Sequence, residues 1–206
     1  RPLLNMAETM RYKVHIDGVS PDARGEIENA ITVVPNFPRP GLVFKDLSAV
    51  LGSPLAFKTV IDGLVARYQS KGVTAVVGIE CRGYCFAAPV ALGLKVPFVP
   101  FRKPGKLPCK SVGVDFNLGA GGKSACFGKD RLEMREDGLQ AGSRVLIIDD
   151  MLGTGATLVG ACELVEKVNA EVVECACIVD LSGLNGRERV TKPVFVLIEE
   201  EDGNNI

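Results

Sequence analysis

The segment from Arg144 to Val168 constrains the fold of this 206-residue chain more than any other part. It begins with a short apolar run, Val145–Ile148, whose length and branching are typical of a buried strand. Asp149 and Asp150 follow, then a loop of small residues, and then apolar residues at helical spacing. A buried strand joined in this way to an amphipathic helix is typical of an α/β fold with a parallel sheet.

The loop of this segment has the composition of an anion-binding site. It consists of Gly153, Thr154, Gly155, Ala156 and Thr157. Backbone N–H groups of such a loop and of a helix N-terminus can hold a phosphate group. The carboxylates of Asp149 and Asp150 can accept hydrogen bonds from neighbouring sugar hydroxyls. A glycine turn alone is weak evidence, but the acidic pair in front of it favours a ribose that carries a phosphate.

Other uses of Asp149 and Asp150 are less favoured. No third acid or histidine lies nearby in the sequence, which disfavours a metal ion held by protein ligands alone. Adjacent residues at a strand end tend to point to opposite sides, which disfavours a carboxylate pair that shares a proton. A purely structural aspartate turn is the remaining alternative. It is weaker because the hydroxyls of Thr154 and Thr157 follow directly.

Strands and helices alternate through most of the chain and predict a central parallel sheet flanked by helices. The predicted strands are 74–79, 96–101, 144–149, 171–179 and 194–198, and the predicted helices are 20–33, 53–71, 83–92, 155–168 and 183–190. Residues 1–19 show little pattern and predict a loose lead-in. We therefore expect a lead-in and helix over 1–34 and the main domain over 35–206. Within it, the polar, glycine-rich segment 107–129 predicts a mobile hairpin or flap.

Composition excludes several classes of function. Lys and Arg total 24 against 25 Asp and Glu, so the chain has no basic field for nucleic acid. No apolar run approaches the length of a membrane span. The 7 cysteines form no CxxC pair and there is 1 histidine, which disfavours a zinc site. We expect reduced, core-packed cysteines and a cytoplasmic protein.

Positive charges also follow two other predicted strands. Ligands of parallel sheets bind beyond the carboxyl ends of the strands, where Glu80–Gly83, Arg102–Lys106 and Asp149–Thr157 all fall. Arg82 is a candidate for holding an anionic leaving group, and a surface pair with Glu80 is an equally weighted alternative. The three cations Arg102, Lys103 and Lys106 favour a polyphosphate clamp over a merely solvated face, because Pro104 and Gly105 constrain their turn.

Five segments resemble the adenine branch of the type I phosphoribosyltransferases, in the order found in that family. They are VVPNFPRPGLVFKDL, VVGIECRGYCFAAPVALGL, FVPFRKPGKLP, VLIIDDMLGTGATL and GLNGRERV. The DD-x-x-x-TG-x-T pattern is shared by the wider superfamily, whereas NFPRPG and RKPGKLP are characteristic of the adenine branch. The resemblance covers about Val34 to Ile198, which is most of the chain.

The resemblance implies a type I phosphoribosyltransferase fold with a small hood at about 35–47 and a mobile flap at about 107–129. It implies a pentosyltransferase of purine salvage. Such an enzyme transfers 5-phosphoribose from phosphoribosyl pyrophosphate (PRPP) to N9 of adenine and releases AMP and pyrophosphate. Mg²⁺ would be carried by PRPP and not by a protein cage, and the protein would be a homodimer.

The resemblance also assigns site residues. The 5′-phosphate would lie on the backbone of Gly153–Thr157 and the ribose hydroxyls on Asp149 and Asp150. Pyrophosphate would meet Arg82, with Lys103 and Lys106 contributing, in part from a neighbouring subunit. Adenine would lie under the hood against Phe44, with backbone groups of Val43 reading its polar edge and Lys45 close by.

The chain departs from the family pattern at two positions. Lys45 stands where many members carry arginine, so the planar fork of the guanidinium is lost. Gly119 stands where members usually carry a flap glutamate that helps to handle the purine proton. General acid–base catalysis is worth about 10²–10⁴-fold. Asp115, if the flap register shifts, and Glu80 are candidate substitutes for the missing acid.

These departures leave two alternatives to an active adenine phosphoribosyltransferase. One is a catalytically weakened paralogue that binds PRPP or a nucleotide, and the other is a transferase for a different purine. A nucleic-acid-binding regulator on the same fold is disfavoured by the near-neutral charge of the chain.

Overall fold

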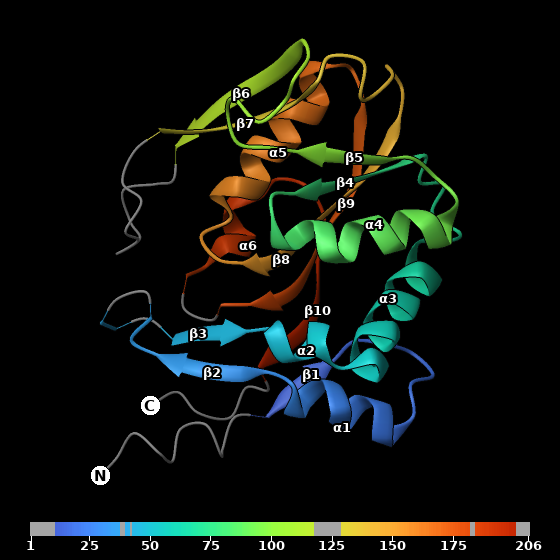
Figure 1. The fold of residues 1–206 in the computed structure, drawn as a ribbon, viewed down its shortest axis with the longest axis vertical. Helices are drawn as coiled ribbons and strands as arrows, with labels where there is room; N and C mark the ends of the chain where they lie inside the picture. Colours follow the sequence, from blue (N-terminus) through green and yellow to red (C-terminus); the bar gives the residue numbers. More distant parts are fainter. Residues whose placement is uncertain (1–10, 38–39, 42, 118–128, 182–183, 201–206) are drawn as a thin grey trace.

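A six-stranded sheet forms the centre of the computed structural model, which describes residues 11–37, 40–41, 43–117, 129–181 and 184–200 (Figure 1). The strands lie in the order β1-β10-β9-β8-β4-β5. Their bounds are β1 Tyr12–Val14, β4 Ala75–Ile79, β5 Phe98–Phe101, β8 Arg144–Leu152, β9 Glu171–Asp180 and β10 Val194–Glu200. All neighbouring pairs are parallel except β1 with β10. The predicted parallel sheet is confirmed.

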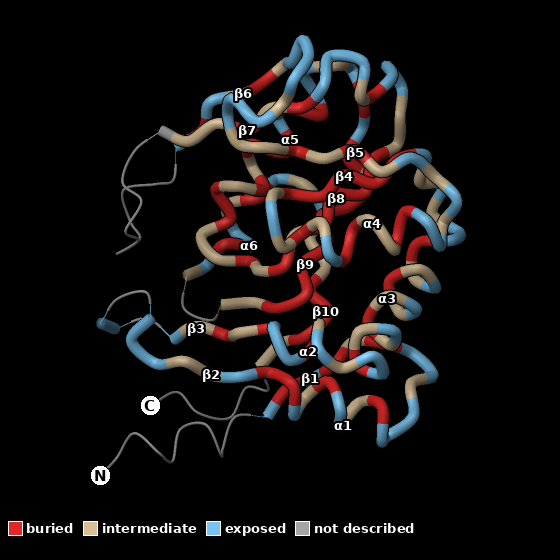
Figure 2. Tube along the Cα trace, in the orientation of Figure 1, coloured by how far each residue is buried: buried red, intermediate tan, exposed pale blue. Residues whose placement is uncertain are grey.

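Helices and a hairpin cover the two faces of this sheet. The first face packs against α1 Pro21–Asn29, α2 Ser48–Gly52, α3 Pro54–Tyr68 and α4 Arg82–Leu94. The second face packs against α5 Ala156–Lys167, α6 Gly186–Arg189 and the antiparallel hairpin of β6 Ser111–Asn117 and β7 Lys129–Arg135. Figure 2 shows the buried residues concentrated between these layers. No helix in the described ranges is long and apolar enough to cross a membrane.

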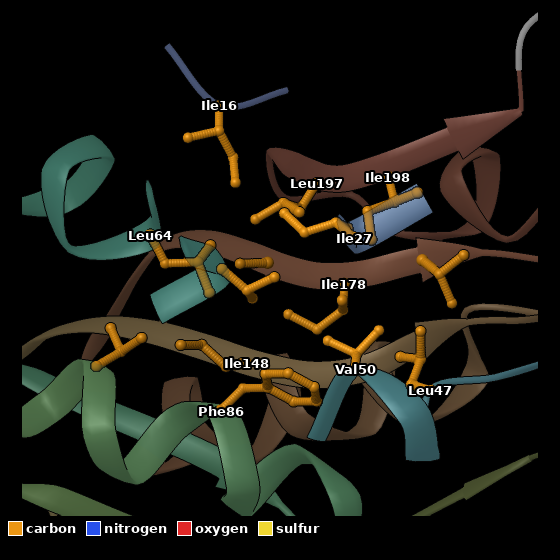
Figure 3. Packing of buried hydrophobic residues seen from close by; sticks show 14 of the residues in the cluster. Ile16, Ile27, Leu47, Val50, Leu64, Phe86, Ile148, Ile178, Leu197 and Ile198 are labelled. Atoms are coloured by element: carbon orange, nitrogen blue, oxygen red, sulfur yellow. The ribbon is translucent and has the colours of Figure 1, made fainter. Parts of the chain in front are cut away.

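The continuous apolar run of β8 supplies both cores. Leu146 and Ile148 belong to the first core, Val145 and Ile147 to the second, and all four side chains are fully buried. Alternating side chains of a strand point to opposite faces, so a strand buried on both sides must be apolar throughout. Figure 3 shows Ile148 in the first core with side chains from the covering helices, including Phe86.

Two helices begin where the sequence predicts. Ser20 and Ser53 each precede a proline, and their side-chain oxygens accept hydrogen bonds from the backbone N–H groups of Ala23 and Ala56. These contacts satisfy N–H groups that have no partner inside the helix. Each serine is therefore an N-cap, and each proline occupies the first turn.

Three predicted boundaries are wrong. The first helix ends at Asn29, not near residue 33, because Thr32–Pro35 form strand β2, which pairs antiparallel with β3 Val43–Asp46. Residues 12–14, predicted as part of a loose lead-in, form the edge strand β1. Strand β8 runs on through the aspartate pair to Leu152, because β9 continues beside it to Asp180.

A hairpin is present, but the predicted range 107–129 is too short, because its second strand begins at Lys129 and runs to Arg135. Its stem packs on α5: Lys167 donates a hydrogen bond to the Gly113 carbonyl, and Phe116 lies directly against Gly160. Leu132 and Met134 of β7 are the stem residues that are fully buried. The predicted tip of the flap, residues 118–128, lies outside the described residues.

The expectation that all cysteines pack in the core is wrong. Cys162, Cys175 and Cys177 are buried, but Cys81, Cys85 and Cys109 are exposed, and Cys126 lies outside the described residues. The buried three lie on α5 and β9, where small apolar residues face the second core. The exposed three lie at the start of α4 and before β6, where the chain leaves the sheet.

A buried carboxylate fastens α3 to the sheet. Glu174 of β9 accepts hydrogen bonds from the Tyr68 hydroxyl at 2.7 Å, from Lys71 at 3.0 Å and from Arg67 at 3.2 Å. Burial pushes the pKa of Glu174 up, but the Tyr68 hydrogen bond, Lys71 and Arg67 outweigh it and hold this pKa below its ordinary value. The charged form is therefore the one that the fold stabilises.

We predict that Glu174→Gln lowers the free energy of unfolding at pH 7 by about 3 kcal/mol, because two cations and a hydroxyl lose their common acceptor. The depressed pKa contributes stability above the unfolded value of 4.5 and loses it as pH falls through the lower folded value. Urea denaturation from pH 7 to pH 3 should therefore show a steeper loss for the wild type than for the variant. Glu171→Gln, which changes an exposed carboxylate of the same strand, is the control and should change little.

Candidate functional site

The carboxyl ends of β9, β8, β4 and β5 lie next to one another in the sheet. The loops that leave β8, β4 and β5 are those in which the sequence places its candidate residues. The hairpin of β2 and β3 projects from the body of the molecule below α6 in the view of Figure 1. The three predicted loops therefore share one edge, as expected for a parallel sheet.

Arg82 meets the acidic pair. It begins α4, and its Nε lies 2.6 Å from Oδ2 of Asp150, which has a relative exposure of 7%. This contact is an ion pair, and Oδ2 is a buried oxygen without a hydrogen-bond partner among the described residues. A buried carboxylate oxygen in this state is suited to a hydroxyl donor from a ligand. Arg82 does not pair with Glu80, the alternative that the sequence left open.

Asp149 differs from its neighbour. Its Oδ1 accepts a hydrogen bond from the backbone N–H of Asp150 at 2.9 Å. Burial, and then the charge of Asp150, raise the pKa of Asp149 well above its ordinary value, and Arg82 offsets only part of this. The pair therefore favours a ligand that brings hydrogen-bond donors to the carboxylates.

Gly83 allows this close approach. A Cβ atom at Gly83 would lie 2.8 Å from the carbonyl oxygen of Ile148 and 3.2 Å from Asp149. Any larger residue would push the start of α4 away from β8. The glycine after Arg82 thus sets the distance between the guanidinium and the acids.

The small-residue loop ends in a left-handed residue, Gly155, with φ 74°, and α5 begins at Ala156. It packs directly on α6: a Cβ at Gly155 would lie 2.3 Å from the carbonyl oxygen of Gly186. A Cβ at Gly186 would lie 2.0 Å from the carbonyl oxygen of Gly153. The backbone of the small-residue loop therefore contacts the backbone of α6 directly, and Gly186 supports the loop through this contact.

The contact of Gly186 with the small-residue loop was not predicted from sequence patterns. The segment GLNGRERV pointed only to the family and to a short helix. Asn185, with φ 50°, precedes Gly186 in a conformation that asparagine tolerates better than most residues. The pair Asn-Gly before a helix is the signal that marks a tight backbone approach here.

The turn after β5 is held by Glu80. This carboxylate accepts hydrogen bonds from the Lys103 backbone N–H at 3.0 Å and from Arg102 Nε at 3.3 Å. Arg102 also donates to the Lys106 carbonyl at 2.8 Å. Burial pushes the pKa of Glu80 up, but these donors outweigh it and lower that pKa. A carboxylate held in its charged form is a poor general acid, so the geometry disfavours Glu80 as the substitute acid.

The three predicted cations, Arg102, Lys103 and Lys106, have different surroundings. Arg102 is occupied within the turn, whereas Lys103 pairs with Asp130 of β7 and Lys106 is exposed. Only Lys106 of the three extends into solvent without an ion pair among the described residues. Lys103 must leave Asp130 before it can meet an anion at the strand ends.

Strand β3 brings an aromatic ring to the site. The Arg82 guanidinium lies 5.3 Å from the centre of the Phe44 ring, and Phe37 meets Phe44 edge-on at 5.1 Å. Val43 is 38% exposed. Lys45 is 1% exposed and donates a hydrogen bond to the Asp180 carbonyl, so its ammonium is not on the side of Phe44. Phe44 thus places an aromatic face beside the Arg82 guanidinium, and a flat ring can stack on such a face.

Of the two remaining candidates, Asp115 and Gly119, the structure describes only Asp115. Asp115 lies on β6 and pairs with Arg131 at 3.2 Å. Gly119 lies outside the described residues. Within the described part of the chain, no group of three or more His, Cys, Asp or Glu residues is placed to hold a metal ion.

Comparisons with known proteins identify similar sequences and structures. A family model described as "Phosphoribosyl transferase domain" matches residues 47–206. Adenine phosphoribosyltransferase 3 of Arabidopsis thaliana is 45% identical over 174 residues, 84% of this chain and 91% of that protein. The crystal structure of adenine phosphoribosyltransferase from Rhodothermus marinus has a TM-score of 0.77 and 38% identity, over 87% of this chain and 99% of that one. The Saccharomyces cerevisiae enzyme, complexed with an imino-altritol bisphosphate and adenine, has a TM-score of 0.76 and 33% identity, over 86% and 99%.

We predict that Gly186→Ala weakens PRPP binding by roughly tenfold to a hundredfold, because the added methyl displaces the loop by the order of 1 Å. Isothermal titration calorimetry with PRPP and Mg²⁺ measures the effect. Gly25→Ala is the matched control, since a Cβ at Gly25 in α1 meets no atom within 4 Å. Equal affinities for wild type and Gly186→Ala would show that α6 does not support the loop.

Proposed function

This chain belongs to the phosphoribosyltransferase family and, within it, to the adenine phosphoribosyltransferases, and we propose that it transfers 5-phosphoribose from PRPP to N9 of adenine. The products are AMP and pyrophosphate, so the reaction salvages a purine base. One observation supports the proposal most directly. Asp149 and Asp150 directly precede the glycine loop near the carboxyl end of β8, and Arg82 at the start of the neighbouring α4 forms an ion pair with Asp150 at 2.6 Å.

The proposed roles follow the geometry. The backbone of Gly153–Thr157 binds the 5′-phosphate, where the N-terminus of α5 favours negative charge. Asp149 and Asp150 accept hydrogen bonds from the ribose hydroxyls and so fix the sugar. Phe44 stacks on adenine, and backbone groups of Val43 and Lys45 read its polar edge.

Arg82 completes the site by stabilising the leaving pyrophosphate, and Lys106 and Lys103 add charge once Lys103 leaves Asp130. The bond from C1 of the ribose to pyrophosphate breaks through an oxocarbenium-like state, so the leaving group gains negative charge. Fixed cations stabilise that charge more in this state than in the ground state. Holding the sugar at both its phosphate and its hydroxyls keeps C1 aligned with N9.

Mg²⁺ fits this site as a partner of PRPP. Asp149 and Asp150 would hold the ribose whose hydroxyls carry the ion, and the described residues contain no group of three or more His, Cys, Asp or Glu that could hold Mg²⁺ without PRPP. Bound with PRPP, Mg²⁺ would neutralise charge on the pyrophosphate.

Several finer properties belong to the same proposal. Residues 35–206 form the catalytic unit, with a hood at 35–47 and a flap at 107–129, and the segment 1–34 supports it through β1 and α1. The protein acts in the cytoplasm as a homodimer, and the partner subunit adds cations to the pyrophosphate site. The length and identity of the matches to adenine phosphoribosyltransferases favour an active adenine enzyme over a weakened paralogue or another purine transferase.

An assay with adenine, PRPP and Mg²⁺ tests the activity, and we predict AMP formation by the wild type. Asp150→Asn should lower kcat/KM by about 100-fold or more, because the ribose loses a charged acceptor. Asp137→Asn, at an exposed aspartate that pairs with Arg135, is the control and should keep wild-type kinetics. PRPP binding by calorimetry with no AMP would indicate the weakened paralogue, and faster turnover of another base in competition would indicate another substrate.

The glycine at position 119 generates a separate prediction. If a flap carboxylate handles the purine proton, Gly119→Glu should raise kcat by about 10²-fold, within the usual range for general acid–base catalysis. Gly121→Glu, which adds the same charge two residues away, is the matched control. No gain in Gly119→Glu would show that this chain handles the proton by another group.

A further inference from the structure

The β2–β3 hairpin is a separate two-stranded sheet in which each strand pairs only with the other. Its position relative to the six-stranded sheet is therefore set by side chains and by its two chain connections. Of the residues in β2 and β3, all of which the structure describes, only Lys45 is buried. The residue that enters the interior from this hairpin is thus a cation and not an apolar side chain.

We infer that Lys45 is a positioning residue that anchors the hairpin to the edge of the main sheet and thereby sets the place of Phe44 over the site. Lys45 Nζ donates a hydrogen bond to the Asp180 carbonyl of β9 at 2.7 Å. It lies 3.1 Å from Oε1 of Glu200 on β10 and 5.6 Å from the centre of the Tyr12 ring on β1. One ammonium group therefore contacts three neighbouring strands.

We refer to the three groups that contact the Lys45 ammonium, the Asp180 carbonyl, the Glu200 carboxylate and the Tyr12 ring, as the Lys45 socket. Tyr12 and Glu200 face each other in the β1–β10 ladder, so the ring and the carboxylate are held together by backbone pairing. Asp180 is the last residue of β9 and lies one residue beyond Val179, where the register of β9 with β10 ends. A buried ammonium needs a carboxylate and hydrogen-bond acceptors, and this corner of the sheet supplies both.

The alternation of β3 connects this socket to the site. Phe44 precedes Lys45, and successive side chains of a strand point to opposite faces. With Lys45 fixed on the inner face, Phe44 is directed toward Arg82, whose guanidinium lies 5.3 Å from its ring centre. A shift of the Lys45 anchor would move the aromatic wall relative to Arg82.

This inference rests on the proposed function only in naming adenine as the ring that Phe44 receives. It changes the role of Lys45 within that function. The resemblance placed Lys45 at the base, whereas the structure buries its ammonium among Asp180, Glu200 and Tyr12. Lys45 then affects base affinity through the position of β3 and does not distinguish one purine from another by its side chain.

The experiment compares Lys45→Met, which keeps an unbranched side chain without the charge, with Lys45→Arg, which keeps the charge. Lys58→Met is the matched control, since Lys58 is an exposed lysine of α3 paired with Asp62. The first readout is hydrogen exchange of the free protein, which needs no substrate. Lys45→Met should speed exchange in β2 and β3 by about tenfold or more while β8 stays protected, and Lys58→Met should match the wild type.

The second readout is steady-state kinetics. Lys45→Met should raise KM for adenine by about tenfold and leave KM for PRPP within about twofold, because only the hood moves. The ranking of adenine, hypoxanthine and guanine as substrates should stay as in the wild type, and Lys45→Arg should recover most of the adenine affinity. If Lys45→Met fails to fold, Glu200→Gln removes the carboxylate from the other side and should give the same local exchange pattern.

Unchanged hydrogen exchange in β2 and β3 of Lys45→Met would contradict the inference that Lys45 anchors the hairpin, whichever reaction the protein catalyses. An altered ranking of the three bases would overturn it in favour of direct contact with the base. Faster exchange in the hairpin of a protein that makes no AMP would support the anchor and count against the proposed function alone.

Discussion

Strand β8 is buried on both faces, and most of the molecule depends on this constraint. Its four apolar residues Val145–Ile148 divide between two cores, so helices must cover both sides of the sheet. Asp149 and Asp150 follow this run within β8, and Met151 and Leu152 after them again pack in the two cores. The sheet order brings the ends of β4 and β5 beside the acidic pair. The location of the site is thus a consequence of how the core is built.

Close backbone contact, more than charge, then sets the distances within the site. Gly83 lets α4 approach β8 so that Arg82 reaches Asp150, and Gly155 and Gly186 let the small-residue loop lie directly on α6. Each contact leaves no space for a methyl group. The site is therefore fixed largely before any ligand binds, which lowers the cost of positioning a substrate.

Sequence patterns predicted the parallel sheet, the serine caps of α1 and α3, and the loops that meet at one edge, because each rests on local periodicity or capping chemistry. They did not predict β1 or β2. Strand β1 exists because it pairs with β10, which is distant in the sequence, and β2 exists because it pairs with β3, which has no clear strand pattern. The support of the loop by Gly186 and the burial of Lys45 were missed for the same reason. Both depend on contacts between segments far apart in the chain, which composition and spacing do not record.

Helix α5 connects the small-residue loop mechanically to the β6–β7 hairpin. Its first residue, Ala156, closes the small-residue loop, while Gly160 and Lys167 hold the stem of the β6–β7 hairpin through Phe116 and the Gly113 carbonyl. Behind the same loop, Arg189 of α6 donates a hydrogen bond to the carbonyl of Asn117, the last residue of β6. The small-residue loop and the base of the β6–β7 hairpin therefore both pack on α5 and α6. A force applied to either is carried to the other without passing through the central sheet.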